Sequence, residues 1–286
     1  MSIAQATQKI PPRTVPARIL IGWLARDAAV SYLMNECVFD EPLTAEAAEQ
    51  LWTRYRDAVA ALPERDCCAP ACIPLSPAEK TIADRFLKFH RQHPQPSVRD
   101  VIKINPLNLV AHQPYVLMNK AAEYAKNASD AATYAQHSLD IAKGINNIQF
   151  NHGLNFMDVP VPHGEFAIAF NGNPQSWVVL ELARHISVTA FQGRMLLWAG
   201  YHRSYAFMDR ENPEGIERSL LVALTTDADF LVSAQSPNQG LRALVCGLRP
   251  PLFRDFFNDS LFMTTNLKRK RFVLQIRAQC FGVDET

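Results

Sequence analysis

The residues best suited to chemistry in this chain are Gly200, Tyr201, His202 and Arg203, which follow one another at an expected strand-to-helix junction. Gly200 lets the backbone turn sharply and approach a ligand closely. The first amides of the following helix have no partner inside it, and such a helix start attracts anions, phosphate above all. Arg203 can hold a phosphate with its planar guanidinium. His202 can donate a hydrogen bond or move a proton near neutral pH, which makes it the candidate catalytic residue. We therefore predict a phosphate-binding site at 200–203.

This turn resembles that of the ParB/sulfiredoxin-like domains. The pattern Gly-x-His-Arg-x-x-Ala at 200–206 follows an expected strand, and Ala206 is small where the helix must pack close to a sheet. Upstream, 104–116 is similar to the N-terminal box of ParB-like domains, with Gln113 and Pro114 as its Gln-Pro pair. The resemblance implies that the turn and its helix bind nucleotide phosphates. It also makes His112 and Gln113 candidate ligand contacts, although loop residues packed on the fold would look the same.

The differences from that family limit which reaction the resemblance implies. Tyr201 stands where sulfiredoxin has its nucleophilic cysteine, so sulfinic acid reductase activity is not expected. Tyr115 replaces the arginine of the ParB box, and no Glu-Asn-x-Gln-Arg box follows, so a CTP switch is not implied. Nucleotide hydrolysis or phosphotransfer stays open, and with it the question of whether the protein is an enzyme. Mg²⁺ is expected with a nucleoside triphosphate, whose oxygens it neutralises.

Two alternatives do not require a phosphate ligand. The chain could be a non-catalytic protein-interaction module that keeps the fold without the chemistry, its turn holding only a surface arginine. It could also be a DNA-associated factor that uses the basic run at 268–271. The formal net charge of +1 argues against a general nucleic-acid binder, although a local basic patch is compatible with it. We therefore expect a small phosphate-containing ligand, and nothing in the sequence identifies a protein partner.

The cysteines and the hydropathy pattern bear on metals and on location. Cys67, Cys68 and Cys72 lie together in a proline-rich segment, but no second Cys/His cluster has the spacing of a zinc site. We therefore expect free thiols and no zinc, and we predict no metal site elsewhere. No stretch reaches the roughly 20 apolar residues that span a bilayer, and the N-terminus has no secretory pattern. These features favour a soluble, cytoplasmic protein without a membrane partner.

The elements that must position the turn belong to an α/β or α+β fold. We expect a disordered arm at 1–16, a helical region at 17–97 with a linker at 63–77, and a mixed-sheet α/β domain with a C-terminal extension at 98–286. Within the helical region, the apolar spacing predicts a helix at 18–39. Thr44 and the Ser76-Pro77-Ala78-Glu79 capping box predict the starts of two more helices.

In the α/β domain the pattern predicts strands and helices around the turn. Runs rich in β-branched residues on either side of Gly193 predict a hairpin, with Met195–Trp198 extended and Ser204–Met208 helical. Further strands are expected at 98–104, 165–170, 219–224 and 272–278. Further helices are expected at 131–143, 177–185 and 252–257.

Overall fold

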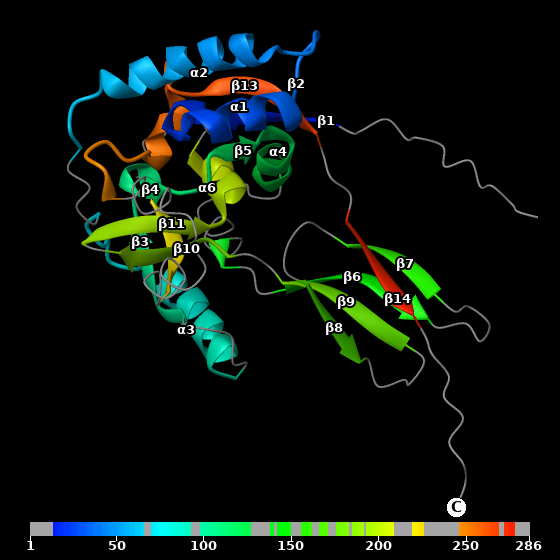
Figure 1. Ribbon diagram of the computed structural model, residues 1–286. Helices are drawn as coiled ribbons and strands as arrows, with labels where there is room; N and C mark the ends of the chain where they lie inside the picture. The colour runs from blue at the N-terminus through cyan, green and yellow to red at the C-terminus, as the bar shows by residue number, and fades with distance from the viewer. Residues whose placement is uncertain are drawn as a thin grey trace, which may run out of the picture. The chain divides into compact units, whose positions relative to one another are not determined.

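A computed structural model places helices on mixed and antiparallel sheets, the expected α/β or α+β class (Figure 1). The structure describes residues 14–65, 70–92, 98–126, 138–139, 142–149, 156–161, 166–170, 176–182, 185–191, 193–208, 219–225, 246–268 and 272–277. Within these residues, no helix is both long enough and apolar enough to cross a membrane. The chain divides into two compact units. The larger unit comprises 14–140 and 184–268, and the smaller comprises 1–13, 141–183 and 269–286.

In one sheet of the larger unit, a strand from the start of the unit pairs with a strand from its end. It is antiparallel, with strand order β2-β13-β1-β5, and its strands are Thr14–Ile19 (β1), Cys37–Val38 (β2), Tyr115–Leu117 (β5) and Met263–Lys268 (β13). Val15, Ala17 and Ile19 are buried on one face of β1. The arm expected at 1–16 is therefore wrong for 14–16, and the rest of that range lies outside the described residues. The helix expected at 18–39 is confirmed only over Arg26–Asn35, because β1, a short helix (Ile21–Trp23, η1) and β2 take other parts of that range.

Three helices lie in this part of the chain, and the second and third begin where their caps predict. They are Arg26–Asn35 (α1), Ala45–Ala60 (α2) and Pro77–Gln92 (α3). The Thr44 side chain accepts a hydrogen bond from the Ala47 amide at 3.2 Å. The capping box that begins α3 is also confirmed, since Ser76 and Glu79 each accept from the other's backbone amide.

A five-stranded mixed sheet carries the turn. Its order is β3-β12-β10-β11-β4, and its strands are Val98–Ile104 (β3), Val110–Ala111 (β4), Ser187–Phe191 (β10), Arg194–Ala199 (β11) and Leu220–Thr225 (β12). A short helix (Pro106–Asn108, η2) joins β3 to β4. The predicted hairpin is confirmed, because β10 and β11 pair in antiparallel fashion and Gly193 between them has a φ of 77°. The strands expected at 98–104 and 219–224 are present.

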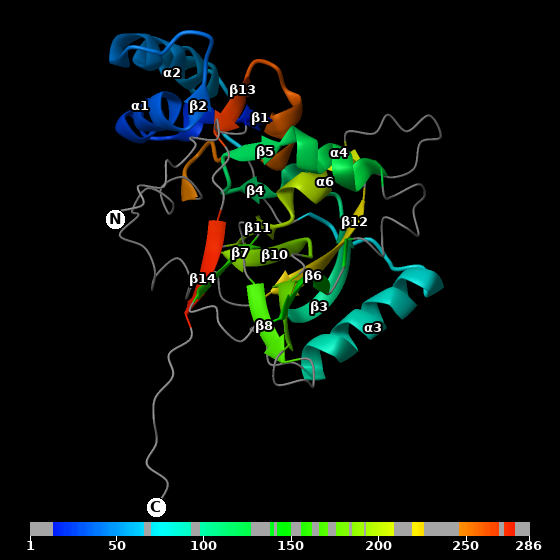
Figure 2. The ribbon, with the colours of Figure 1, turned by 90° about the vertical axis from the view of Figure 1, so that its right-hand side faces the viewer.

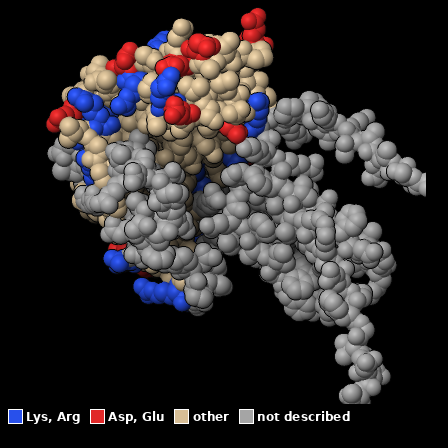
Figure 3. All heavy atoms as spheres, viewed as in Figure 1, with Lys and Arg blue, Asp and Glu red and all other residues tan. Residues whose placement is uncertain are grey.

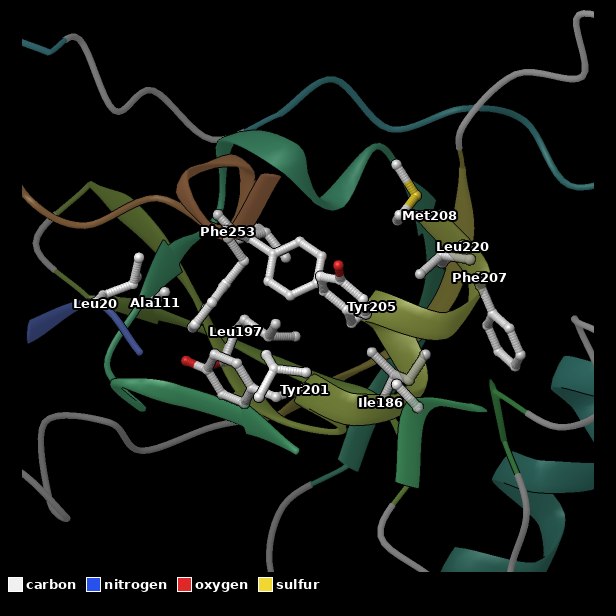
Figure 4. Close-up of a cluster of buried hydrophobic side chains, with 14 of the residues drawn as sticks. Leu20, Ala111, Ile186, Leu197, Tyr201, Tyr205, Phe207, Met208, Leu220 and Phe253 are labelled. Carbon is white, nitrogen blue, oxygen red and sulfur yellow. The ribbon is translucent and has the colours of Figure 1, made fainter. Parts of the chain in front are cut away.

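Two helices, Met118–Lys126 (α4) and Tyr201–Met208 (α6), pack against each other in the larger unit (Figure 2). Figure 4 shows Tyr201, Tyr205 and Met208 of α6 inside a cluster of apolar side chains. That cluster also takes Ile186, Leu197 and Leu220 from around the five-stranded sheet, and Phe253 from the predicted helical turn at Phe253–Phe257 (η3). Because α6 is buried along its length, it is a central core element and not a surface helix.

The smaller unit is built from strands that are distant in the sequence. Its strands are Ala142–Gln149 (β6), Phe156–Val161 (β7), Phe166–Phe170 (β8), Ser176–Leu182 (β9) and Phe272–Arg277 (β14). They form two antiparallel sheets, with orders β6-β9-β8 and β14-β7. The strands expected at 165–170 and 272–278 are confirmed. The helix expected at 177–185 is wrong, since β9 occupies this range as far as Leu182 and pairs with strands on both sides. The helix expected at 131–143 overlaps β6 at its end, and most of it lies outside the described residues.

Candidate functional site

The strand-to-helix turn has the predicted backbone. Residues 195–198 lie in β11, Gly200 has a φ of 87°, and α6 starts at Tyr201. The amide of Ser204 donates to the Gly200 carbonyl at 2.8 Å, which closes the first helical turn. A Cβ atom on residue 200 would lie 2.8 Å from the Ile186 Cα atom. Glycine is therefore required at this position by both conformation and space.

The Tyr201 hydroxyl joins the turn to the loop that contains His112 and Gln113. This hydroxyl accepts hydrogen bonds from the backbone amides of His112, at 2.8 Å, and Gln113, at 3.2 Å. It donates to the Leu197 carbonyl at 2.7 Å. Burial raises the pKa of Tyr201 well above its ordinary value, so the hydroxyl keeps its proton. The two segments predicted as candidate ligand contacts, 89 residues apart, are thus held together by a buried hydroxyl.

His112 lies flat against Trp198 next to this network. The ring centroids are 4.7 Å apart with an interplanar angle of 18°. Nδ1 of His112 is 3.0 Å from the Leu197 carbonyl oxygen, a distance at which a protonated Nδ1 donates to it. Burial lowers the pKa of His112, so the ring is neutral at pH 7. Gln113 donates its side-chain amide to the Tyr115 carbonyl at 2.6 Å. These two residues supply a flat ring surface and a positioned amide, but no charge.

The orientation of the His202 ring is fixed by Leu117, which follows the loop that contains His112 and Gln113. Its Nδ1 accepts a hydrogen bond from the Leu117 amide at 3.1 Å. A neutral imidazole that accepts at Nδ1 holds its proton on Nε2. In this arrangement Nε2 is a hydrogen-bond donor and not a base. The geometry suits His202 to binding an anion better than to abstracting a proton.

Arg203 is not the surface arginine that the interaction-module alternative assumed. The residue is 5% exposed, and its guanidinium carbon is 4.6 Å from the centre of the Tyr124 ring of α4. The reason is that α6 packs against α4 and the core at once, so its first turn has no exposed side for a long side chain. The positive charge of Arg203 therefore lies inside the protein behind the turn.

The remaining sequence candidates lie apart from the turn or outside the described residues. Cys67 and Cys68 fall outside them, and Cys72 is exposed. Within the described residues no group of three His, Cys, Asp or Glu side chains is placed to hold a metal. Of the basic run at 268–271, only Lys268 is described, and its ammonium group donates to the Asn35 carbonyl at 2.8 Å.

Two aromatic residues next to the turn did not figure among the predicted site residues. Trp198 stacks on His112, and Tyr124 lies under Arg203. Trp198 lies only two residues before Gly200, so its closeness to the turn could have been read from the sequence. Tyr124 lies 79 positions from Arg203, and no local pattern links them. Comparison of the chain with protein-family models, curated proteins and solved structures finds no match.

The Tyr201 network gives a direct test of how the loop is held. Tyr201→Phe is expected to lower the free energy of unfolding by about 1–3 kcal/mol, because the two amides and one carbonyl lose a buried partner. Urea unfolding measures the change, and amide hydrogen exchange at His112 and Gln113 should become faster. The control is Tyr55→Phe in α2, a buried tyrosine whose hydroxyl makes no hydrogen bond within the described residues. Equal losses in the two variants would contradict a bonding role for the Tyr201 hydroxyl.

Proposed function

We propose that the protein binds a phosphate-containing ligand, with a nucleotide as the leading class, at the start of α6. The observation that supports this most is the combination of a positive-φ glycine, a helix start and a buried arginine in the first helical turn. The resemblance of 200–206 to the ParB/sulfiredoxin-like turn points to the same chemistry. The proposal covers binding, and any nucleotide hydrolysis or phosphotransfer would be a further step.

The binding energy would come from backbone amides and from the field of Arg203. The amides of residues 201–203 have no acceptor within α6, because a helix leaves its first amides without internal partners. The helix dipole adds a partial positive charge at the same end. A guanidinium surrounded by protein interacts with a nearby anion more strongly than one in water, because the local dielectric constant is lower. Arg203 would thus act from behind the turn and not as an exposed fork.

Half-buried side chains around the turn would hold the rest of a nucleotide. His202 can donate from Nε2 to a phosphate oxygen. The paired rings of His112 and Trp198 offer a flat surface on which a base could stack. A nucleoside triphosphate would bring Mg²⁺ with it, since the cation neutralises the phosphate oxygens.

The experiment is calorimetric titration with inorganic phosphate, ADP, ATP and CTP, the nucleotides with Mg²⁺, together with melting curves. A ligand that binds the native state must raise the melting temperature. Arg203→Ala is expected to weaken nucleotide binding by about one to two orders of magnitude, because the phosphates lose the attraction of a buried positive charge nearby. Arg203→Lys should recover part of this affinity, because lysine keeps the charge but not the planar group.

The matched control is Arg18→Ala, because the Arg18 guanidinium, like that of Arg203, lies over an aromatic ring. Arg18 also donates a hydrogen bond to a backbone carbonyl. Its guanidinium carbon is 4.3 Å from the centre of the Phe262 ring, and Nη1 donates to the Phe256 carbonyl at 3.0 Å. Both variants should melt at lower temperature, but only the Arg203 variant should lose affinity. One rival is a protein-interaction module without phosphate chemistry, in which the buried Arg203 has only a structural role. That rival is correct if no ligand raises the melting temperature and Arg203→Ala only destabilises the fold.

A further inference from the structure

Helix α3 carries a basic face that the phosphate site does not use. The helix packs on β3, which is an edge strand of the five-stranded sheet (Figure 2). Ala83 and Phe86 are buried on its inner side. Four exposed basic residues lie on its outer side: Lys80, Arg85, Lys88 and Arg91. Figure 3 shows blue side chains along the lower edge of the larger unit, where α3 lies. This local concentration of positive charge is not apparent from the net charge of the chain, which is +1.

The four positive charges of this face outnumber the two carboxylates of α3, Glu79 and Asp84. Among the described residues, none of the four basic side chains forms an ion pair. Asp84 is the one exposed acidic residue of the helix, and Glu79 is already paired with Lys103 of β3 at 3.1 Å. Asp100 of β3 is exposed as well. The outer face of α3 therefore carries four positive charges against one negative charge.

We propose that α3 binds the phosphate backbone of double-stranded DNA without reading its sequence. Lys80 and Arg91, the first and last of the four, are eleven residues apart, about 16.5 Å at 1.5 Å per residue, which corresponds to roughly five base pairs at 3.4 Å each. A straight helix of this kind fits the major groove of B-form DNA, whereas that of A-form RNA is deep and narrow. The proposal is independent of the phosphate site at α6, and it does not use the basic run at 268–271.

The exposed side chains of α3 that the structure describes favour duplex DNA over other polyanions. Binding of single strands depends on aromatic rings on which bases stack. Membrane-surface helices insert large apolar side chains between the lipid headgroups. Among the side chains of α3 that the structure describes, which leave out those of Phe89 and Gln92, none that is exposed is aromatic or large and apolar. This face can supply contacts from Lys and Arg side chains to the phosphate backbone of DNA.

The test is fluorescence anisotropy with a duplex of about 20 base pairs at several salt concentrations. Each phosphate contact contributes about −0.9 to the slope of log affinity against log salt, so four contacts predict a slope of about −3.6. The variant Arg85→Gln/Lys88→Gln/Arg91→Gln should reduce the slope to about −0.9 and weaken binding at least about tenfold. Glutamine is a good helix former, so the helix should remain, and circular dichroism checks this.

The control removes three exposed charges that lie outside α3: Arg54→Gln/Lys126→Gln/Arg254→Gln. It has the same net charge as the test variant and should keep the slope of the parent. An equal loss in both variants would show a general charge effect and overturn the proposal. Absence of salt-dependent duplex binding by the parent would overturn it too, as would tighter binding to duplex RNA, to a single strand or to anionic vesicles.

Discussion

Replacing Asp255 with alanine is expected to lower the free energy of unfolding by about 3–5 kcal/mol, because the change leaves a buried arginine without its carboxylate. The partner is Arg65, whose two Nη atoms lie 2.5 and 2.9 Å from the two carboxylate oxygens. The side chains are only 7% and 3% exposed. Removing one charge from such a pair costs more than the pair contributes, since the other charge stays buried.

The same two residues also hold the chain ahead of η3. Asp255 accepts from the Leu252 amide at 2.7 Å. Arg65 donates to the Pro250 carbonyl at 3.0 Å, and its backbone amide donates to the Leu248 carbonyl at 2.9 Å. Loss of the carboxylate should therefore loosen the segment at 248–255 as well as remove a charge interaction. Phe253 and Phe256, which belong to the core around α6, lie in or next to this segment.

Urea unfolding of single and double variants separates these effects. Arg65→Met/Asp255→Leu should be more stable than either single variant, because neither charge is then left alone. The control pair is Arg26 and Glu49, which has similar bidentate distances of 2.6 and 2.7 Å but is exposed. Breaking that pair should change stability little, because solvent screens it. A double variant less stable than both single variants would contradict the account of the buried pair.

Local signals were enough to predict the elements that surround the turn. The caps at Thr44 and Ser76, the hairpin around Gly193 and the turn at Gly200 are each encoded within a few neighbouring residues. Their chemistry is short-range: a hydroxyl that accepts from an amide, or a glycine that adopts positive φ. Where the structure depends on such contacts, the sequence pattern and the fold agree.

The errors arose where a distant partner decides the structure. β1 is a strand because it pairs with β13, whose residues lie some 250 positions later, whereas the local sequence predicted an arm at 1–16 and a helix from residue 18. β9 is a strand because β6 and β8 flank it, which outweighs the helical interpretation of 177–185. The burial of Arg203 depends on Tyr124 in the same way. The motif could thus be located from the sequence, whereas the direction of its charged side chain could not.

Gly200→Ala is expected to lower the free energy of unfolding by about 3 kcal/mol, from left-handed backbone strain of about 1–2 kcal/mol and a comparable overpacking cost. The φ of 87° is unfavourable for alanine, and the new Cβ would lie 2.8 Å from the Ile186 Cα atom. Ile186 cannot easily move away. Its amide donates to the Ser138 carbonyl, and its carbonyl accepts from the Ala223 amide, each at 2.9 Å.

Comparison with Gly193→Ala separates the steric part of the stability loss at Gly200 from the conformational part. Gly193 has a similar φ of 77°, but a Cβ there would meet nothing within 4 Å. This variant should therefore lose only the conformational part, about 1–2 kcal/mol. The difference between the two variants in urea unfolding measures how tightly the turn is packed against Ile186. Equal losses would mean that the turn can shift by a few tenths of an ångström, and Gly200 would then be needed for its backbone conformation alone. A larger loss at Gly200 means that packing against Ile186, as well as conformation, fixes the position of the α6 start and of the amides proposed to bind phosphate.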